Sequence, residues 1–236
     1  MQSPPSGAQD SKTPFDDVVA LGAAIGRAKG LDAAHAEIAG RISLGIFFAE
    51  TGGVQNLENA RSSAYKGSYQ TGPSEDRIGQ KKWAALKEKV AAVDSALIAR
   101  DEKEQARVGK HSQRYNHWTA VRNGIMNAHA DLFPQLPAIV KALPEPIDQI
   151  RLFELIQIVP TPTRAAIKSG DLLNYRVSDR RIMGYLRNNS MFTFGKKDRA
   201  RTSATYREIM DAMWLFNGSL RRALAKYDEI KAPKKK

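Results

Sequence analysis

The stretch "GIFFAETGGVQN", residues 45–56, places one acid between an apolar segment and a glycine-rich one. Two phenylalanines precede Glu50, and a pair of glycines follows it. Upstream, apolar residues recur every three or four positions from about residue 32 onward, which predicts an amphipathic helix. The two glycines end that helix, so Glu50 lies in its last turn.

A carboxyl group in this position favours its protonated form for two reasons. The C-terminal end of a helix carries partial negative charge, and burial beside Phe47 and Phe48 disfavours a charged group. Both effects raise the pKa of Glu50. A carboxylic acid that keeps its proton near neutral pH suits the cleavage of a glycosidic bond, because the leaving oxygen must receive a proton. The alternative is a solvated acid at the end of a helix, without a chemical role.

Helical periodicity extends over almost the whole chain, so the predicted fold class is mostly α. Ser74, Ser178 and Ser203 are predicted to cap the helices that follow them. The last of these is expected to be a long helix, in which Asn217 and Gly218 suggest a close approach or a break. The polar segment 99–110 is predicted to be a solvated helix end or a protruding arm. The loop 51–73 shows no clear period. Long loops are usually functional or disordered, and the tyrosines here favour an ordered, functional loop that holds any small sheet.

The composition excludes several kinds of chemistry. The chain has 236 residues, of which 42% are hydrophobic and 26% charged, ordinary values for a globular protein with a buried core. No apolar run reaches the roughly 18 residues that a membrane span needs. Cysteine is absent, which excludes disulfides and thiolate chemistry. The four histidines fit no common metal-binding spacing and no nucleotide-binding motif occurs, so neither a metal nor a cofactor is expected.

Basic charge is concentrated toward the C-terminus. The formal net charge is +12; residues 161–236 hold 18 Lys and Arg against 7 Asp and Glu, whereas residues 1–160 hold 19 against 18. A basic third of this kind suggests an anionic partner, such as nucleic acid, an anionic membrane surface or an acidic cell-wall polymer. The alternative is a basic surface that serves only solubility.

Three segments around and after Glu50 carry a family resemblance: "FFAETGG", "ARSSAYKG" and "GSYQTG". In this order they resemble the lysozyme-like fold of lytic transglycosylases and goose-type lysozymes. That family shows Glu-Ser-x-x-Asn, followed by Ser-x-x-Gly-Ala-x-Gly-Leu-Met-Gln. Glu50 matches the catalytic acid, Thr51 the serine after it, Gly67 the last glycine and Gln70 the glutamine. A later segment, "WLFNGS", is similar to the Ala-Tyr-Asn-Ala-Gly segment that lines the family's cleft.

The resemblance implies a lysozyme-like helical domain with a small irregular or β-containing loop region after the catalytic helix. It implies cleavage of the β-1,4 bond between N-acetylmuramic acid and N-acetylglucosamine in peptidoglycan. Glu50 would protonate the glycosidic oxygen. In the transglycosylase route it then acts as the base while the muramic acid 6-hydroxyl closes a 1,6-anhydro ring. The residues implied to bind the substrate are Thr51, Ser63, Tyr65, Gly67, Ser68, Tyr69, Gln70, Phe216 and Asn217.

Two alternatives stay within this family. Hydrolysis by a lysozyme route usually needs a second carboxylate. Glu58 is the candidate, because Glu75 and Asp76 are better explained as acids in the first turn of a helix. Ser68 and Tyr69 stand where the family has Leu and Met. That departure leaves open an inactive lysozyme-like domain that serves as a scaffold or binding protein.

A third alternative is a non-enzymatic, basic, helical protein that binds nucleic acid. Residues 175–208 are basic with interleaved aromatic residues, and their arginines and lysines are suited to phosphate contacts. This reading leaves Glu50, the glycines after it and the tyrosine-bearing loop unexplained. The expected partners are therefore peptidoglycan glycan strands and an anionic cell-wall surface, with no membrane span, and nucleic acid is the less favoured partner.

The predicted organisation is one catalytic domain between two tails. Residues 1–14 are polar and rich in Pro, Ser and Gly, as in a flexible tail. Residues 15–230 are expected to form a single lysozyme-like domain with helical extensions, and residues 231–236 a basic tail. The N-terminus resembles the start of a mature exported protein, which predicts a periplasmic or secreted location with the signal peptide removed.

Overall fold

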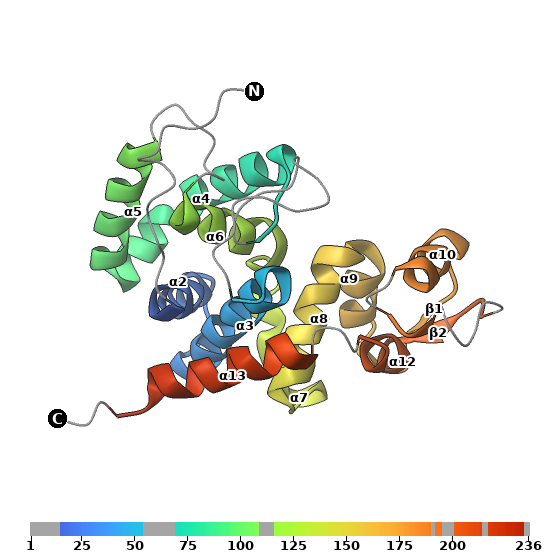
Figure 1. The fold of residues 1–236 in the computed structure, drawn as a ribbon. Helices are drawn as coiled ribbons and strands as arrows, with labels where there is room; N and C mark the ends of the chain where they lie inside the picture. The colour runs from blue at the N-terminus through green and yellow to red at the C-terminus, as the bar shows by residue number, and fades with distance from the viewer. Residues whose placement is uncertain are drawn as a thin grey trace. The chain divides into compact units, whose positions relative to one another are not determined.

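The computed structural model of the chain describes residues 15–53, 69–108, 116–189, 192–194, 201–213 and 217–233. Within these ranges the protein is mostly helical, as predicted, with one small two-stranded sheet (Figure 1). The chain forms two compact units: unit 1 consists of residues 1–136 and 223–236, and unit 2 of residues 137–222. The expectation of one catalytic domain over residues 15–230 stays a prediction.

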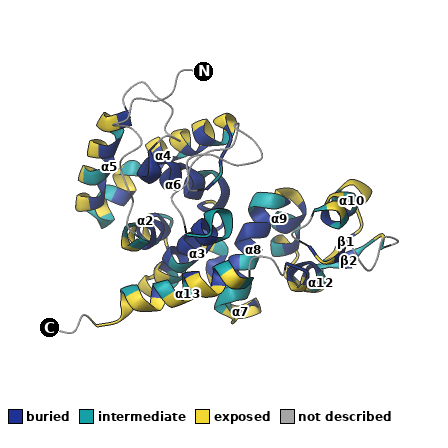
Figure 2. Cartoon of the chain, in the orientation of Figure 1, coloured by how far each residue is buried: buried dark blue, intermediate teal, exposed yellow. Residues whose placement is uncertain are grey.

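Unit 1 is built around a short helix that is buried on every side. All eight residues of this helix, α6, are buried (Figure 2). Several helices of the unit pack against it, and the last helix of the unit begins in unit 2. The described elements of unit 1 are α2 (Phe15–Ala28), α3 (Ala33–Thr51), α4 (Pro73–Val93), α5 (Ser95–Val108), α6 (His117–Gly124), the π-helix η2 (Ile125–His129), the 3-10 helix η3 (Phe133–Gln135) and the C-terminal part of α13 (Asn217–Lys231).

Small residues bring α2 and α3 into close contact along their length, so the two helices lie side by side (Figure 1). A Cβ atom on Gly22 would lie 2.3 Å from the hydroxyl oxygen of Ser43, and one on Gly40 would lie 2.6 Å from the carbonyl oxygen of Val19. No larger side chain fits at either position without moving a helix. This packing fixes α3, the helix that carries Glu50.

The polar helix α5 is not the solvated arm that the sequence predicts. Asp101 and Glu104 are buried. The carboxylate of Asp101 accepts hydrogen bonds from the indole nitrogens of Trp83 and Trp118, both at 2.9 Å, and from the guanidinium of Arg122 at 2.6 Å. A buried charge is tolerated when hydrogen-bond donors and an opposite charge surround it. Within the described part of residues 99–110, the prediction of a solvated segment is therefore wrong for Asp101 and Glu104, whereas Glu102, Lys103 and Arg107 are exposed.

Unit 2 combines helices with the two-stranded sheet. The hydroxyl of Tyr206 donates to the hydroxyl oxygen of Thr163 at 2.8 Å and joins two of these helices in the core. The strands pair antiparallel, with Arg176 opposite Thr205. This sheet lies outside the loop 51–73, where a small sheet was expected. The described elements of unit 2 are most of α7 (Leu136–Ala142), α8 (Pro146–Ile158), α9 (Pro160–Lys168), β1 (Arg176–Val177), α10 (Arg180–Asn188), β2 (Ala204–Thr205), α12 (Tyr206–Asp211) and the start of α13.

Three helices begin close to the serines predicted to cap them, but other residues form the caps. Asp179 caps α10 and Thr205 caps α12, each through a side-chain oxygen that accepts backbone N–H groups. The helix α4 follows Gly72. The three serine caps are therefore wrong by one or two residues. The expected long last helix forms two elements, because α12 ends at Asp211 and α13 begins at Asn217, close to the position at which the sequence suggests a break.

Candidate active site

The C-terminal turn of α3 carries Glu50 and Thr51, both half-buried. The helix ends as predicted, because Gly52 adopts a left-handed conformation with φ of 66° and its N–H donates to the carbonyl of Phe48 at 2.8 Å. The hydroxyl of Thr51 donates to the carbonyl of Phe47 at 2.8 Å. Its proton is thus used within the helix, and a substrate would meet this hydroxyl as an acceptor.

An aromatic cluster lies beneath this turn. Phe47 and Phe48 are buried, and the ring of Phe15 lies 5.9 Å and 5.3 Å from theirs, measured between centroids. A Cβ atom on Gly53 would lie 2.6 Å from the ring of Phe48, and Gly53 has a φ of 85°. Only glycine meets both demands. Gly53 therefore passes directly over the buried ring of Phe48.

Tyr69, the first described residue after residue 53, is anchored in unit 1 by its side chain. Its side chain has no exposed surface, and its hydroxyl donates to the carbonyl oxygen of Ser43 on α3 at 2.7 Å. A Cβ atom on Gly124 would lie 2.5 Å from the Tyr69 side chain, and the ring of His129 lies 6.0 Å away. A ring enclosed in this way has no face left for a sugar. The structure gives Tyr69 an anchoring position in place of the expected substrate contact.

Gln70 follows this anchor and has an unusual backbone conformation. Its φ is 46°, and it is the one residue other than glycine with a positive φ among those described. A side chain in this region of conformational space costs on the order of 1–3 kcal/mol, and such strain concentrates at functional sites. Ser43, to which the neighbouring Tyr69 is bonded, lies seven residues before Glu50 on α3, about 10 Å along the helix axis. Gln70 is thereby tied to the helix that carries the candidate acid.

The two acids in the first turn of α4 have structural partners. The carboxylate of Glu75 accepts the backbone N–H of Gly72, just before the helix. Asp76 is 5% exposed and accepts a hydrogen bond from the side-chain nitrogen of Asn123 at 2.9 Å. Both acids therefore stabilise α4, as the sequence predicts. The other candidate for a second carboxylate, Glu58, lies outside the described residues.

The predicted site residues do not all lie in the same unit. Asn217 begins α13, and its amide oxygen accepts a hydrogen bond from a guanidinium nitrogen of Arg151 at 2.6 Å, within unit 2. Glu50, Thr51, Tyr69 and Gln70 belong to unit 1. The predicted site residues that lie outside the described part of the chain are Ser63, Tyr65, Gly67, Ser68 and Phe216.

The π-helix that supports Tyr69 could not be predicted from the sequence. The helix α6 continues into the π-helix η2, in which the N–H of Ala130 reaches back to the carbonyl of Ile125 at 2.9 Å. Such widened turns are rare and often lie at functional sites. Periodicity predicts a helix from about Trp118 to His129, and the structure is helical over this range. The widened last turn leaves no periodic signal in the sequence, and its last residue, His129, is fully buried beside Tyr69.

Within the described residues, no three His, Asp or Glu side chains gather as they would around a metal ion. None of the described helices combines the length and the apolar character needed to cross a membrane. No model of a protein family matches the chain, and neither the curated proteins nor the solved structures gave a match to it.

Proposed function

We propose that this protein cleaves the β-1,4 bond between N-acetylmuramic acid and N-acetylglucosamine in peptidoglycan, as a lytic transglycosylase whose catalytic residue is Glu50. The observation that carries the proposal is the strained backbone of Gln70, anchored through Tyr69 to the helix that ends at Glu50. The family resemblance assigns a role in binding sugar to this same glutamine. An independent sign of strain at that position favours a functional role over an accidental match.

In the proposed reaction Glu50 first donates its proton to the glycosidic oxygen, and the bond to the departing N-acetylglucosamine breaks. The carboxylate then accepts the proton of the muramic acid 6-hydroxyl, whose oxygen bonds to the anomeric carbon and closes the 1,6-anhydro ring. The acid is thereby restored, and no water is consumed. The position of Glu50 at the negative end of α3, above Phe47 and Phe48, suits a carboxyl group that must hold a proton.

The structural hydrogen bonds of Glu75 and Asp76 favour the anhydro route over hydrolysis. Hydrolysis usually uses a second carboxylate to activate water or to form a covalent intermediate. Glu75 and Asp76 are engaged with α4 and Asn123. A single acid that serves as proton donor and then as base needs no such partner. A periplasmic or secreted location, peptidoglycan strands as substrate and an anionic wall surface as partner belong to the same proposal.

The test is digestion of purified peptidoglycan by the wild-type protein and by Glu50→Gln, with the soluble fragments identified by mass spectrometry. We expect fragments that end in 1,6-anhydro-muramic acid, and a rate at least about 100-fold lower for the variant. Glu102→Gln, an exposed acid on α5, is the matched control and should keep full activity. Reducing ends would replace the anhydro route by hydrolysis and make Glu58 the next residue to test. Release that Glu50→Gln leaves unchanged would overturn the assignment.

A further inference from the structure

Unit 2 carries a surface that the proposed reaction does not use. The helix α10 turns Met183 and Leu186 into the core. Its opposite face, called the α10 surface below, presents four exposed side chains: Arg180, Arg181, Tyr185 and Asn188. We propose that the α10 surface binds single-stranded nucleic acid, independently of the candidate active site in unit 1.

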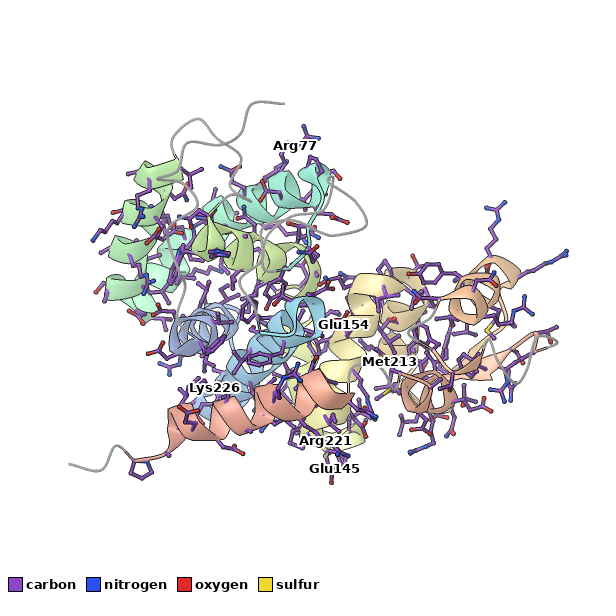
Figure 3. All side chains as sticks on the ribbon, viewed as in Figure 1. Arg77, Glu145, Glu154, Met213, Arg221 and Lys226 are labelled. Carbon is purple, nitrogen blue, oxygen red and sulfur yellow. The ribbon has the colours of Figure 1, made fainter. Side chains whose placement is uncertain are left out.

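Two cations on this surface are available to a ligand. Among the described residues, none forms a hydrogen bond or ion pair with the guanidinium groups of Arg180 and Arg181, and nitrogen-tipped side chains stand off α10 in Figure 3. Two other arginines of the unit are engaged: Arg176 donates to the hydroxyl of Ser203 at 2.7 Å, and Arg187 to the carbonyl of Arg201 at 3.0 Å. Free guanidinium groups on a helix are suited to phosphate oxygens.

Tyr185 supplies the contact that distinguishes nucleic acid from other polyanions. It is 47% exposed, one of two large hydrophobic residues exposed to that extent in the described part of the chain. Its hydroxyl accepts a hydrogen bond from the side-chain nitrogen of Asn189 at 2.9 Å. Arg181 lies four residues earlier, on the same side of the helix. An exposed ring beside a cation is suited to base stacking with a nearby phosphate contact.

The exposed ring of Tyr185 favours a single strand over a duplex as the ligand. Bases in a duplex already stack on one another, whereas a single strand leaves their faces open to an aromatic side chain. Residues 137–222 hold 15 Lys and Arg against 8 Asp and Glu, so the unit as a whole attracts a polyanion. The acid nearest in sequence, Asp179, accepts the backbone N–H groups of Arg181 and Ile182. Its charge is thus partly offset by the start of the helix.

The experiment measures binding of a labelled oligothymidine of about 15 nucleotides by fluorescence anisotropy, between about 50 and 200 mM salt. The wild-type protein should bind, with an affinity that falls as salt rises. Arg180→Gln combined with Arg181→Gln should reduce the slope of log K against log salt by about 1.4, because two phosphate contacts are lost. Tyr185→Ala should weaken binding about tenfold at every salt concentration and leave the slope unchanged.

Matched controls come from α4 in unit 1, where Arg77 stands off the helix (Figure 3). Arg77→Gln combined with Lys81→Gln removes the same charge, and Ile78→Ala removes an apolar side chain that is also 47% exposed. Both should bind like the wild type, as should Glu50→Gln. Equal losses from the α4 and α10 variants would overturn the proposal, as would a wild-type protein that does not bind. Retention on wall material that only the α10 variants lose, without oligonucleotide binding, would assign the surface to a wall polymer instead.

Discussion

Gln70 is the residue at which the backbone and the proposed chemistry meet. A side chain with a Cβ atom pays about 1–2 kcal/mol to adopt the left-handed conformation that Gln70 shows. Glycine would adopt it freely, and the chain uses glycine with positive φ at Gly30, Gly52, Gly53 and Gly170. The glutamine side chain must therefore provide something that glycine would not. In the proposed reaction that contribution is a set of hydrogen bonds to the sugar.

Two substitutions at Gln70 separate its chemistry from its strain. Gln70→Ala and Gln70→Gly both remove the side chain, so both should lower peptidoglycan cleavage by about tenfold or more. They differ in strain: the glycine variant should be about 0.5–1 kcal/mol more stable than the alanine variant, after allowance for the greater freedom of glycine in the unfolded chain. Digestion assays and denaturant unfolding measure the two quantities. Full activity in both variants would mean that Gln70 does not contact substrate.

At the scale of the element, the contact between α4 and α6 depends on one glycine. A Cβ atom on Gly79 would lie 2.2 Å from the carbonyl oxygen of Asn123, a backbone atom that cannot move alone. The same Asn123 bonds Asp76 on α4 through its side chain. Behind this contact, Arg122 reaches Asp101 with both side chains fully buried. The helix pair is thus joined by a close backbone approach and a polar network.

Gly79→Ala and Gly184→Ala should change stability in opposite directions. The first forces α4 and α6 apart and should lower the free energy of unfolding of unit 1 by about 1–3 kcal/mol. Gly184 lies inside α10, has a negative φ and open space around its Cβ position, so alanine there should raise the stability of unit 2 by about 0.5–1 kcal/mol. Denaturant unfolding of both variants measures the shifts. A stable Gly79→Ala protein would mean that the two helices can separate without cost.

The sequence predicts elements better than it predicts their ends or their partners. Periodicity is a local signal, so it correctly predicts a helix that ends after Glu50. From residue 83 onward, apolar residues repeat every three or four positions, which predicts a core-facing stripe, and Trp83 and Leu86 of that stripe are buried on α4. The stripe also runs on to Leu97, although the helix breaks at Asp94, whose carboxylate accepts the N–H of Leu97 at 3.0 Å and starts α5. Which of two neighbouring polar residues caps a helix depends on small differences in free energy, and these leave no trace in the periodicity of the sequence. The burial of Asp101 depends on partners 17 to 21 residues away.

At the scale of the whole molecule, the two proposals fall on different units. Unit 1 carries Glu50 and the strained Gln70, and unit 2, a continuous insertion between residues 136 and 223, carries the α10 surface. The candidate acid could be found from sequence because helix ends and glycines leave local signals. The enclosure of Tyr69 could not, since Ser43, Gly124 and His129 come from other parts of the chain. Because the two proposals depend on residues of different units, each can fail without the other.

Acid stability of the protein should depend on the buried His117. His117 is 4% exposed, and burial lowers its pKa to about 4, against about 6.5 in an unfolded chain. Between these values the unfolded chain binds a proton that the folded chain does not. The contribution of His117 to the free energy of unfolding is therefore fully present well above pH 6.5 and is lost as the pH falls through that value, by about 2 kcal/mol from pH 7 to pH 5.

Denaturant unfolding of the wild type and of His117→Gln at pH 7 and pH 5 measures this contribution. The variant lacks the titrating ring, so its loss of stability between the two pH values should be smaller than that of the wild type by about 2 kcal/mol. The comparison uses the change with pH, so a general loss of stability from the substitution cancels. His35→Gln is the control, because it leaves His117 in place and should keep its contribution. Parallel losses in the wild type and His117→Gln would show that the buried ring takes up its proton while unit 1 stays folded.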